Sequence, residues 1–203
     1  EYDLAVHVPG AAAWARHHRA ATRPRGRAAR PDRTAADRGQ DHRWRMEVRA
    51  AEEVAHELAR AANDWRILHS VPGAGASSVI DHLLVGPGGV VTLTTVPCPG
   101  RTAAVRAGVL HLDGRPTAVV AGAERERARA AATLATAFGR PVGVAAAVVL
   151  VGVRDLASDE QPPTVLVTTG RRLGAWLRDL PETLQPGAVE VLHSLARRST
   201  TWH

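Results

Sequence analysis

Apolar residues recur along the chain with two different periods, and each change of period marks a predicted element. Between residues 48 and 62 they return every three to four positions, with Glu52 and Glu53 on the polar side, which predicts an amphipathic helix. Residues 65–71 alternate as a strand does, and Pro72 follows at its end. The pattern therefore predicts a helix followed directly by a strand.

The stretch 80–100 is the centre of the predicted fold. Two apolar runs, 79–85 and 90–96, flank the tetrapeptide Gly-Pro-Gly-Gly at 86–89. Glycine and proline supply the backbone angles of a tight reversal, so the stretch predicts a β-hairpin. Asp81 lies inside the first run, and a carboxylate among aliphatic residues needs a partner or a function.

Further strands and helices follow the hairpin. Residues 142–153 are uniformly apolar and rich in β-branched side chains, which predicts a central strand covered on both faces. The segment 123–138 is rich in Ala, Arg, Glu and Leu and is followed by Gly139 and Pro141, which predicts a helix. The other predicted elements are strands at 103–106, 109–112, 117–120 and 165–168 and helices at 171–180 and 186–198. This order predicts an α/β layered sandwich.

Length and composition fit one globular domain with appendages. The chain has 203 residues, 45% of them hydrophobic, and no apolar run approaches the roughly 20 residues that span a membrane. We find no signal-peptide pattern, and the single cysteine, Cys98, excludes an internal disulfide and cannot build a zinc site alone. These features favour a cytoplasmic protein that does not act at a membrane.

Positive charge is concentrated at the N-terminal end. Residues 1–49 contain eleven arginines and six acids, whereas residues 50–203 contain fifteen and fourteen. The stretch 16–49 has few large aliphatic residues, so it cannot bury enough surface to offset its ordering entropy. We predict that residues 1–46 form a disordered, Arg-rich arm. The arm either attracts phosphate backbones, or is a solvated tail, or precedes a natural start at Met46, the only methionine.

Four sequence motifs resemble those of one known family. They are WRILH at 65–69, IDHLLVGPGGV at 80–90, PG at 99–100 and RRSTTW at 197–202. Over residues 47–203 the chain resembles the NERD (nuclease-related domain) family, of the PD-(D/E)xK superfamily, in its actinobacterial type. The resemblance implies a restriction-endonuclease-like layered sandwich with a central mixed sheet flanked by helices. It also implies a nuclease site where two acids hold a divalent metal near a lysine.

The residues that the resemblance assigns to this site are only partly present. Asp81 matches the family's metal-binding Asp. Counted back from the Pro-Gly pair at 99–100, the acid-x-Lys triplet falls on Thr94, Thr95 and Val96. Because the chain contains no lysine, the missing amine cannot have moved elsewhere. Asp81 and Thr94 are therefore the candidate remnant of a degenerate catalytic site.

A metal at this site would depend on other acids. The family's helical Gly-Glu pair falls on residues 50–51, which are both alanine, and Glu52 and Glu53 follow directly. Asp81, Glu52 and Glu53 are thus the candidate ligands for Mg²⁺ or Mn²⁺, which usually need few carboxylates. The pattern nevertheless favours a site without bound metal.

Asp81 also has a structural interpretation. It can hydrogen-bond to His82, to His69 or to a backbone amide of a neighbouring strand and remain as part of the scaffold. Alternatively the two histidines can ligate a transition metal beside it, although histidines on strands are more often structural. The sequence leaves these alternatives open.

Three arginines outside the arm are candidate contacts to nucleic acid. Arg125 and Arg129 lie on the predicted helix 123–138, where they are either phosphate contacts or its solvated face. Arg101 follows the Pro-Gly pair and can supply positive charge, but a guanidinium is a poor proton-transfer group.

Two functions remain after these comparisons of residues. The first is a nuclease-related domain with a degenerate site, catalytically impaired, that binds DNA or a protein partner. The second is a divalent-metal-dependent DNA nuclease with a rearranged site around Asp81. We expect the first, and we expect removal of the residues before Met46 to weaken DNA binding more than it lowers the melting temperature.

Overall fold

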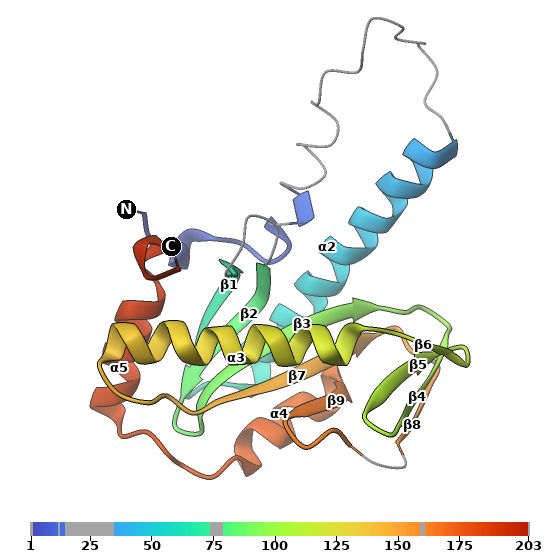
Figure 1. Cartoon of the computed structure of the whole chain (residues 1–203). Helices are drawn as coiled ribbons and strands as arrows, with labels where there is room; N and C mark the ends of the chain where they lie inside the picture. The colour runs from blue at the N-terminus through green and yellow to red at the C-terminus, as the bar shows by residue number, and fades with distance from the viewer. Residues whose placement is uncertain (1, 12, 15–34, 74–78, 159–160, 203) are drawn as a thin grey trace, which may run out of the picture.

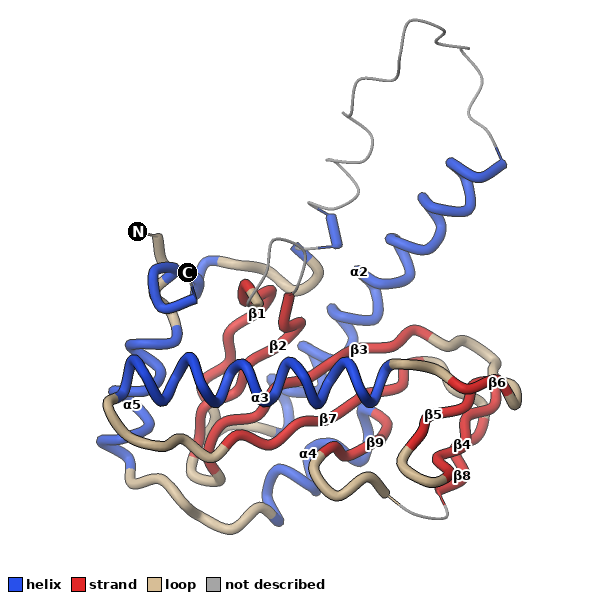
Figure 2. The backbone as a smooth tube through the Cα atoms, in the orientation of Figure 1, coloured by secondary structure: helices blue, strands red, loops and turns tan. Residues whose placement is uncertain are grey.

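A five-stranded mixed sheet forms the centre of the fold, with helices on both of its faces (Figures 1 and 2). The structure, a computed structural model, describes residues 2–11, 13–14, 35–73, 79–158 and 161–202. The strands lie in the spatial order β1 (Arg66–Pro72), β2 (Val79–Gly86), β3 (Gly89–Pro97), β7 (Val144–Val151) and β9 (Val165–Thr169). The first three pair antiparallel, and β3, β7 and β9 pair parallel. This confirms the predicted α/β class and is compatible with a nuclease-like layered sandwich.

Helices α2 (Ala35–Ala61) and α4 (Gly170–Asp179) cover one face of this sheet. Val54 and Leu58 of α2 and Leu173 of α4 are buried against aliphatic side chains of β2, β3 and β7. Each fully buried aliphatic side chain contributes about 1.5–3 kcal/mol of hydrophobic free energy. This layer fixes the C-terminal half of α2 on the sheet.

Helices α3 (Val119–Phe138) and α5 (Pro186–Ala196) cover the opposite face. Ala130 and Leu134 of α3 and Leu192 of α5 are buried there against β1, β2 and β3. Strand β7 contributes buried residues to both faces, as its uniformly apolar sequence predicted. Among the described helices, none combines the length and the apolar character that a membrane span requires.

A second, four-stranded sheet continues from the end of the central one. Its strands are β6 (Arg115–Pro116), β5 (Val109–Leu112), β4 (Thr102–Arg106) and β8 (Asp155–Ser158), in that spatial order. Strands β3 and β7 bend together into β4 and β8, and the N–H of Gly100 donates to the carbonyl of Gly152 at 2.8 Å within this bend. A Cβ at Gly152 would lie 3.1 Å from Pro99 Cα, so a small residue is needed where the two bends touch.

Two elements differ from the sequence-based expectation. The strand predicted at 117–120 is not formed, because α3 begins at Val119 and the N–H of Thr117 donates to the carbonyl of Leu110 instead. Val120 is buried in the core, so tertiary contacts override the β propensity of the two valines. Strand β8 was missed because its sequence, DLAS, has no apolar alternation, and parallel pairing with β4 holds it.

The two ends of the chain meet beside the sheet, where the short helices η1 (Leu4–Val6) and η2 (Ser199–Trp202) lie close together (Figure 1). Leu4 is fully buried in the core, and its N–H donates to the carbonyl of Arg197 at 2.7 Å. The Arg197 guanidinium also forms an ion pair with the Asp3 carboxylate.

The expected disordered arm at 1–46 therefore differs from the structure at both of its described ends. Its first residues are tied to the C-terminus through Leu4, and α2 begins at Ala35 and runs across the expected boundary at residue 47. The composition of the arm as a whole does not show these few local contacts, which include the burial of Leu4 and the Asp3–Arg197 ion pair. Residues 15–34 lie outside the described residues, so for them, and for the division into domains, the expectation stays a prediction.

Candidate functional site

Asp81 lies on the wall of a small open cavity at the carboxyl end of β3. The cavity has a volume of about 190 Å³ and is lined by Gly10, Ala13, Glu47, Ala51, Ser70, Asp81, Thr95, Val96 and Pro97. The carboxyl ends of parallel strands are the common position of ligand sites in α/β sheets. The cavity is therefore the candidate site, and the question for each predicted residue is whether its side chain lines this cavity.

The Asp81 side chain takes the place of a missing strand partner. The pairing of β2 with β3 ends with His82 opposite Leu93. Beyond this pair, Asp81 Oδ2 accepts a hydrogen bond of 2.8 Å from the backbone N–H of Thr95. Hydrogen bonds to an ionised carboxylate are stronger than neutral ones. Of the structural alternatives that the sequence left open, the bond to a neighbouring backbone amide is the one formed.

Thr94 does not reach the cavity. Successive residues of a strand point to opposite faces of the sheet, and Thr95, not Thr94, lines the cavity. The Thr94 hydroxyl instead donates across 3.5 Å to Glu126 Oε2 on α3, on the opposite face. The expected remnant pair of Asp81 and Thr94 is therefore not brought together.

The acid that shares the cavity with Asp81 is Glu47. Glu47 and Ala51 lie one turn apart on α2 and both line the cavity. Glu52 and Glu53 follow at about 100° and 200° further round the helix, are exposed and do not line it. The sequence missed Glu47, although its position one turn before Ala51 was a signal that could have found it.

The predicted ligand set of Asp81, Glu52 and Glu53 does not fit a metal ion, since only Asp81 faces the cavity. Within the described ranges, no group of three or more His, Cys, Asp and Glu side chains is arranged to hold one. Asp81 and Glu47 both line the cavity, Asp81 from β2 and Glu47 from α2, and Mg²⁺ often takes one or two carboxylates together with water and substrate phosphate.

His69 and His82 bond to each other and not to Asp81. Their Nδ1 atoms are 2.8 Å apart, and their ring centroids are 5.0 Å apart with the planes at 87°. The two ring centres are farther apart than the two nitrogens by nearly two ring radii. Each Nδ1 atom therefore lies on the side of its ring that faces the other ring. This is the geometry of an N–H···N bond, in which one ring donates and the other accepts.

This histidine pair is neutral because it is buried. His82 is fully buried, which lowers its pKa to about 3, and the adjacent His69 acts in the same direction. Burial also lowers the pKa of His69. The Nε2 atom of His82 has no hydrogen-bond partner among the described residues. The arrangement favours the structural interpretation of the two histidines over a role as metal ligands.

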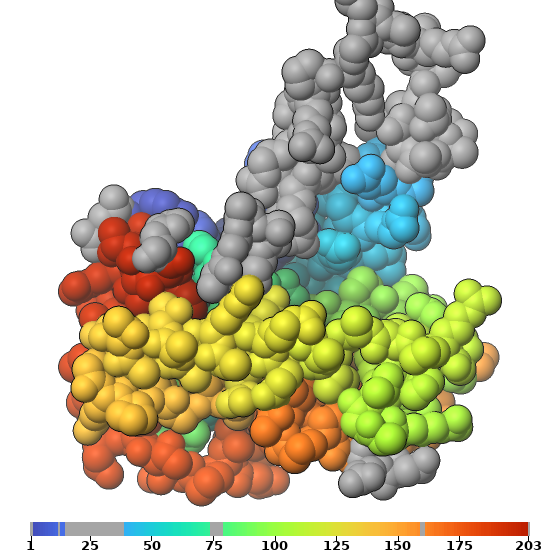
Figure 3. Space-filling view, in the orientation of Figure 1, coloured from blue at the N-terminus to red at the C-terminus, as the bar shows by residue number. Residues whose placement is uncertain are grey.

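The three candidate nucleic-acid contacts are not gathered at the cavity. Arg101 Nε donates to Asp113 Oδ2 at 2.6 Å in the small sheet, and this bond lowers the pKa of the Asp113 carboxyl. Arg125 and Arg129 are exposed on α3, which forms the ridge across the front of the molecule in Figure 3. None of the three lines the cavity.

Comparison with known proteins adds one remote likeness. No protein-family model and no curated protein matches the chain. Among solved structures, the structure of Pyrococcus furiosus SfsA in complex with Ca²⁺ is similar at 14% identity and a TM-score of 0.28. The match covers 64% of this chain and 56% of that chain, so the chain spans little more than half of that protein. At this score we draw no conclusion from the likeness.

Proposed function

We propose that this chain is a nuclease-related, NERD-like domain with a degenerate site that binds DNA or a protein partner and is impaired in cleavage. The observation that carries the proposal is the state of Asp81, whose carboxylate is bonded to the Thr95 amide while Thr94 faces α3. The motif at 80–90 supports the family, and the absence of lysine from the sequence supports the loss of activity.

The rate enhancement that the missing catalytic groups would have supplied also supports impaired cleavage. Removing one electrostatic stabiliser of a transition state costs about 10²–10³ in rate. Losing a group that moves a proton or positions the attacking water costs about 10²–10⁴ more. Val96 lines the cavity at the position where the family has its lysine, and its side chain supplies no positive charge.

A second candidate function is a divalent-metal-dependent DNA nuclease with a rearranged site. The observation that favours it is Glu47, a second acid that lines the same cavity as Asp81. In such an enzyme these two acids would hold Mg²⁺ or Mn²⁺, and the metal would polarise the scissile phosphate.

Incubation of the full chain with supercoiled DNA and Mg²⁺ or Mn²⁺ tests both candidates. The variants are Asp81→Asn, which keeps a hydrogen-bond acceptor for Thr95, and Glu47→Gln. Asp179→Asn, exposed at the end of α4, is the matched control for loss of one negative charge. We expect no metal-dependent cleavage but salt-sensitive DNA binding that Asp81→Asn leaves unchanged. Cleavage that both site variants abolish and the control retains would instead establish the nuclease.

A further inference from the structure

The N-terminal half of α2 extends beyond the sheet (Figure 1). The helix has 27 residues, which corresponds to a length of about 40 Å. Its fully buried side chains begin at Ala50, and none of residues 39–49 is fully buried. An isolated helix of fewer than about 12–15 residues is marginal in water, and the protruding part at 39–49 is shorter than that, so its composition needs a reason other than helix formation.

Basic side chains follow one face of this half. His42, Arg45 and Arg49 are exposed and lie three and four residues apart, which places them in one stripe. Arg43 is exposed as well, and residues 42–49 carry three arginines against the single acid Glu47, a net charge of +2. In the sequence, the neighbouring stretch 16–33 adds seven arginines and one aspartate.

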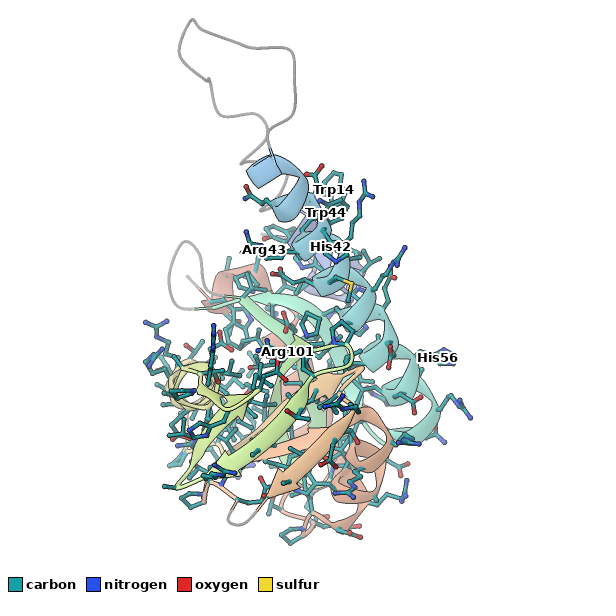
Figure 4. All side chains as sticks on the ribbon, turned by 90° about the vertical axis from the view of Figure 1, so that its right-hand side faces the viewer. Trp14, His42, Arg43, Trp44, His56 and Arg101 are labelled. Carbon is teal, nitrogen blue, oxygen red and sulfur yellow. The ribbon has the colours of Figure 1, made fainter. Side chains whose placement is uncertain are left out.

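Two tryptophans lie beside these basic residues. Trp14 is 53% exposed, and its backbone N–H donates to the carbonyl of Gly10. A Cβ at Gly10 would lie 3.0 Å from Val48 Cα, so the segment that carries Trp14 is in contact with α2. Trp44 lies on α2 itself, with the Arg45 guanidinium 5.9 Å from its ring. Figure 4 shows Trp14, His42, Arg43 and Trp44 around the upper part of α2, well away from Arg101.

We propose that this surface, formed by Trp14, His42, Arg43, Arg45 and Arg49, binds single-stranded nucleic acid. The proposal rests on the proposed function and names the class of its ligand. Arginines neutralise successive phosphates, and the exposed indole of Trp14 offers a face on which an unpaired base stacks. In a duplex the bases are already stacked on each other, so the indole contributes to the binding of single strands only.

The stripe is separate from the cavity around Asp81. His42, Arg45 and Arg49 lie on the side of α2 away from Glu47, because a helical side chain turns by about 100° per residue. Arg43, one turn before Glu47, is the member of the surface on the cavity side. Arg125 and Arg129 belong to α3, on the opposite face of the central sheet, and take no part in this surface.

Fluorescence anisotropy of the full chain with labelled dT20 and with a 20-base-pair duplex tests the proposal, in a series of salt concentrations. We expect tighter binding of dT20. Arg45→Ala combined with Arg49→Ala should lower the slope of log K against log salt by about 1.4, because each contact with a single strand contributes about 0.7. Trp14→Ala should weaken dT20 binding about tenfold and leave duplex binding unchanged.

Arg171→Ala combined with Arg172→Ala is the matched control, since it removes two exposed arginines from α4 without touching this surface. It should keep the parent's preference for dT20 and the larger part of its salt slope, and circular dichroism should show every variant folded. If the chain binds neither probe, the proposed DNA binding and this inference both fail. If the chain binds DNA but prefers the duplex, or if the α2 and α4 variants behave alike, this inference alone is overturned.

Discussion

The two halves of α2 share one helical backbone and differ in what holds them. In the C-terminal half, Val54 and Leu58 are fully buried against the sheet, and Ala61 touches α4 at Gly174. In the N-terminal half, from Gly39 to Arg49, the side chains are exposed or half-buried, and five of the eleven residues are charged. Both halves therefore have the same helical backbone, but different interactions keep them helical. One half is fixed by core contacts, and the other propagates from it.

This difference indicates that residues of the buried half determine stability, whereas residues of the exposed half are available for binding. Helix formation is cooperative with a costly nucleus, so the buried half serves as nucleus for the exposed one. Substitutions in the buried half should change global stability, whereas substitutions in the exposed half should change local order and binding.

The largest expected effect is that of Leu58→Ala in the buried half. It removes a fully buried side chain and leaves a cavity, so the free energy of unfolding should fall by about 2–5 kcal/mol. Met46→Ala, in the half-buried part of the same helix, is the matched substitution and should cost less than about 1 kcal/mol. Urea unfolding measures both, and equal losses would contradict a division of the helix into two halves.

The next effect concerns acid pH. The folded pKa of His82 is about 3, below its unfolded value, so the unfolded chain binds more protons and stability falls as pH falls below about 6.5. The slope should approach about 1.4 kcal/mol per pH unit well below pH 6.5. The loss between pH 6.5 and 4.5 should be about 2.3 kcal/mol, because half of the unfolded His82 is already protonated at pH 6.5.

His82→Leu should make this dependence less steep, because the more deeply buried of the two histidines is gone while His69, whose pKa is also lowered by burial, remains. His56→Gln, on the exposed side of α2, should leave the dependence as in the parent chain. Urea unfolding at several pH values measures the slope. A parent-like slope in His82→Leu would show that other groups cause the acid sensitivity.

A smaller loss is expected where α4 touches the buried half of α2. A Cβ at Gly174 would lie 2.4 Å from Ala61 Cβ, so Gly174→Ala forces the two helices apart and should cost about 1–3 kcal/mol. Thermal unfolding followed by circular dichroism measures the loss. An unchanged melting temperature would mean that α4 adjusts without cost.

The smallest effect is expected for Gly39→Ala in the exposed half. Nothing lies within 4 Å of a Cβ at Gly39, so the change adds helix propensity of up to about 1 kcal/mol without a clash. Hydrogen exchange should slow for amides near residue 39 while global stability stays nearly constant. If the free energy of global unfolding rose as much as the free energy of local opening near residue 39, the exposed half would unfold together with the core.

Much of the fold could be predicted from short-range pattern. The hairpin around residues 86–89, the doubly covered strand β7 and the helix α3 all follow from turn residues and hydrophobic period. The two wrong predictions in the strands and helices after the hairpin have one cause. Strand β8 and the start of α3 at Val119 are decided by partners distant in sequence, which override local propensity.

The candidate site was predicted less completely than the fold. Asp81 was found because a charge in an apolar strand is visible in the sequence. Glu47 was missed and Glu52 and Glu53 were chosen instead, because the rotation of α2 about its axis relative to the sheet selects which acid faces the cavity. A shift of a single residue turns a helical side chain by about 100°, so proximity in sequence cannot replace this rotation.

By itself the sequence determined the layered α/β class, the lone acid on the second strand and the complete lack of lysine. Only the tertiary structure decided that this acid bonds to the Thr95 amide, that Thr94 faces α3 and that two histidines share a buried hydrogen bond. Residue types and local periods are written in the chain, whereas strand register and helix rotation arise only when distant segments bury their apolar faces together.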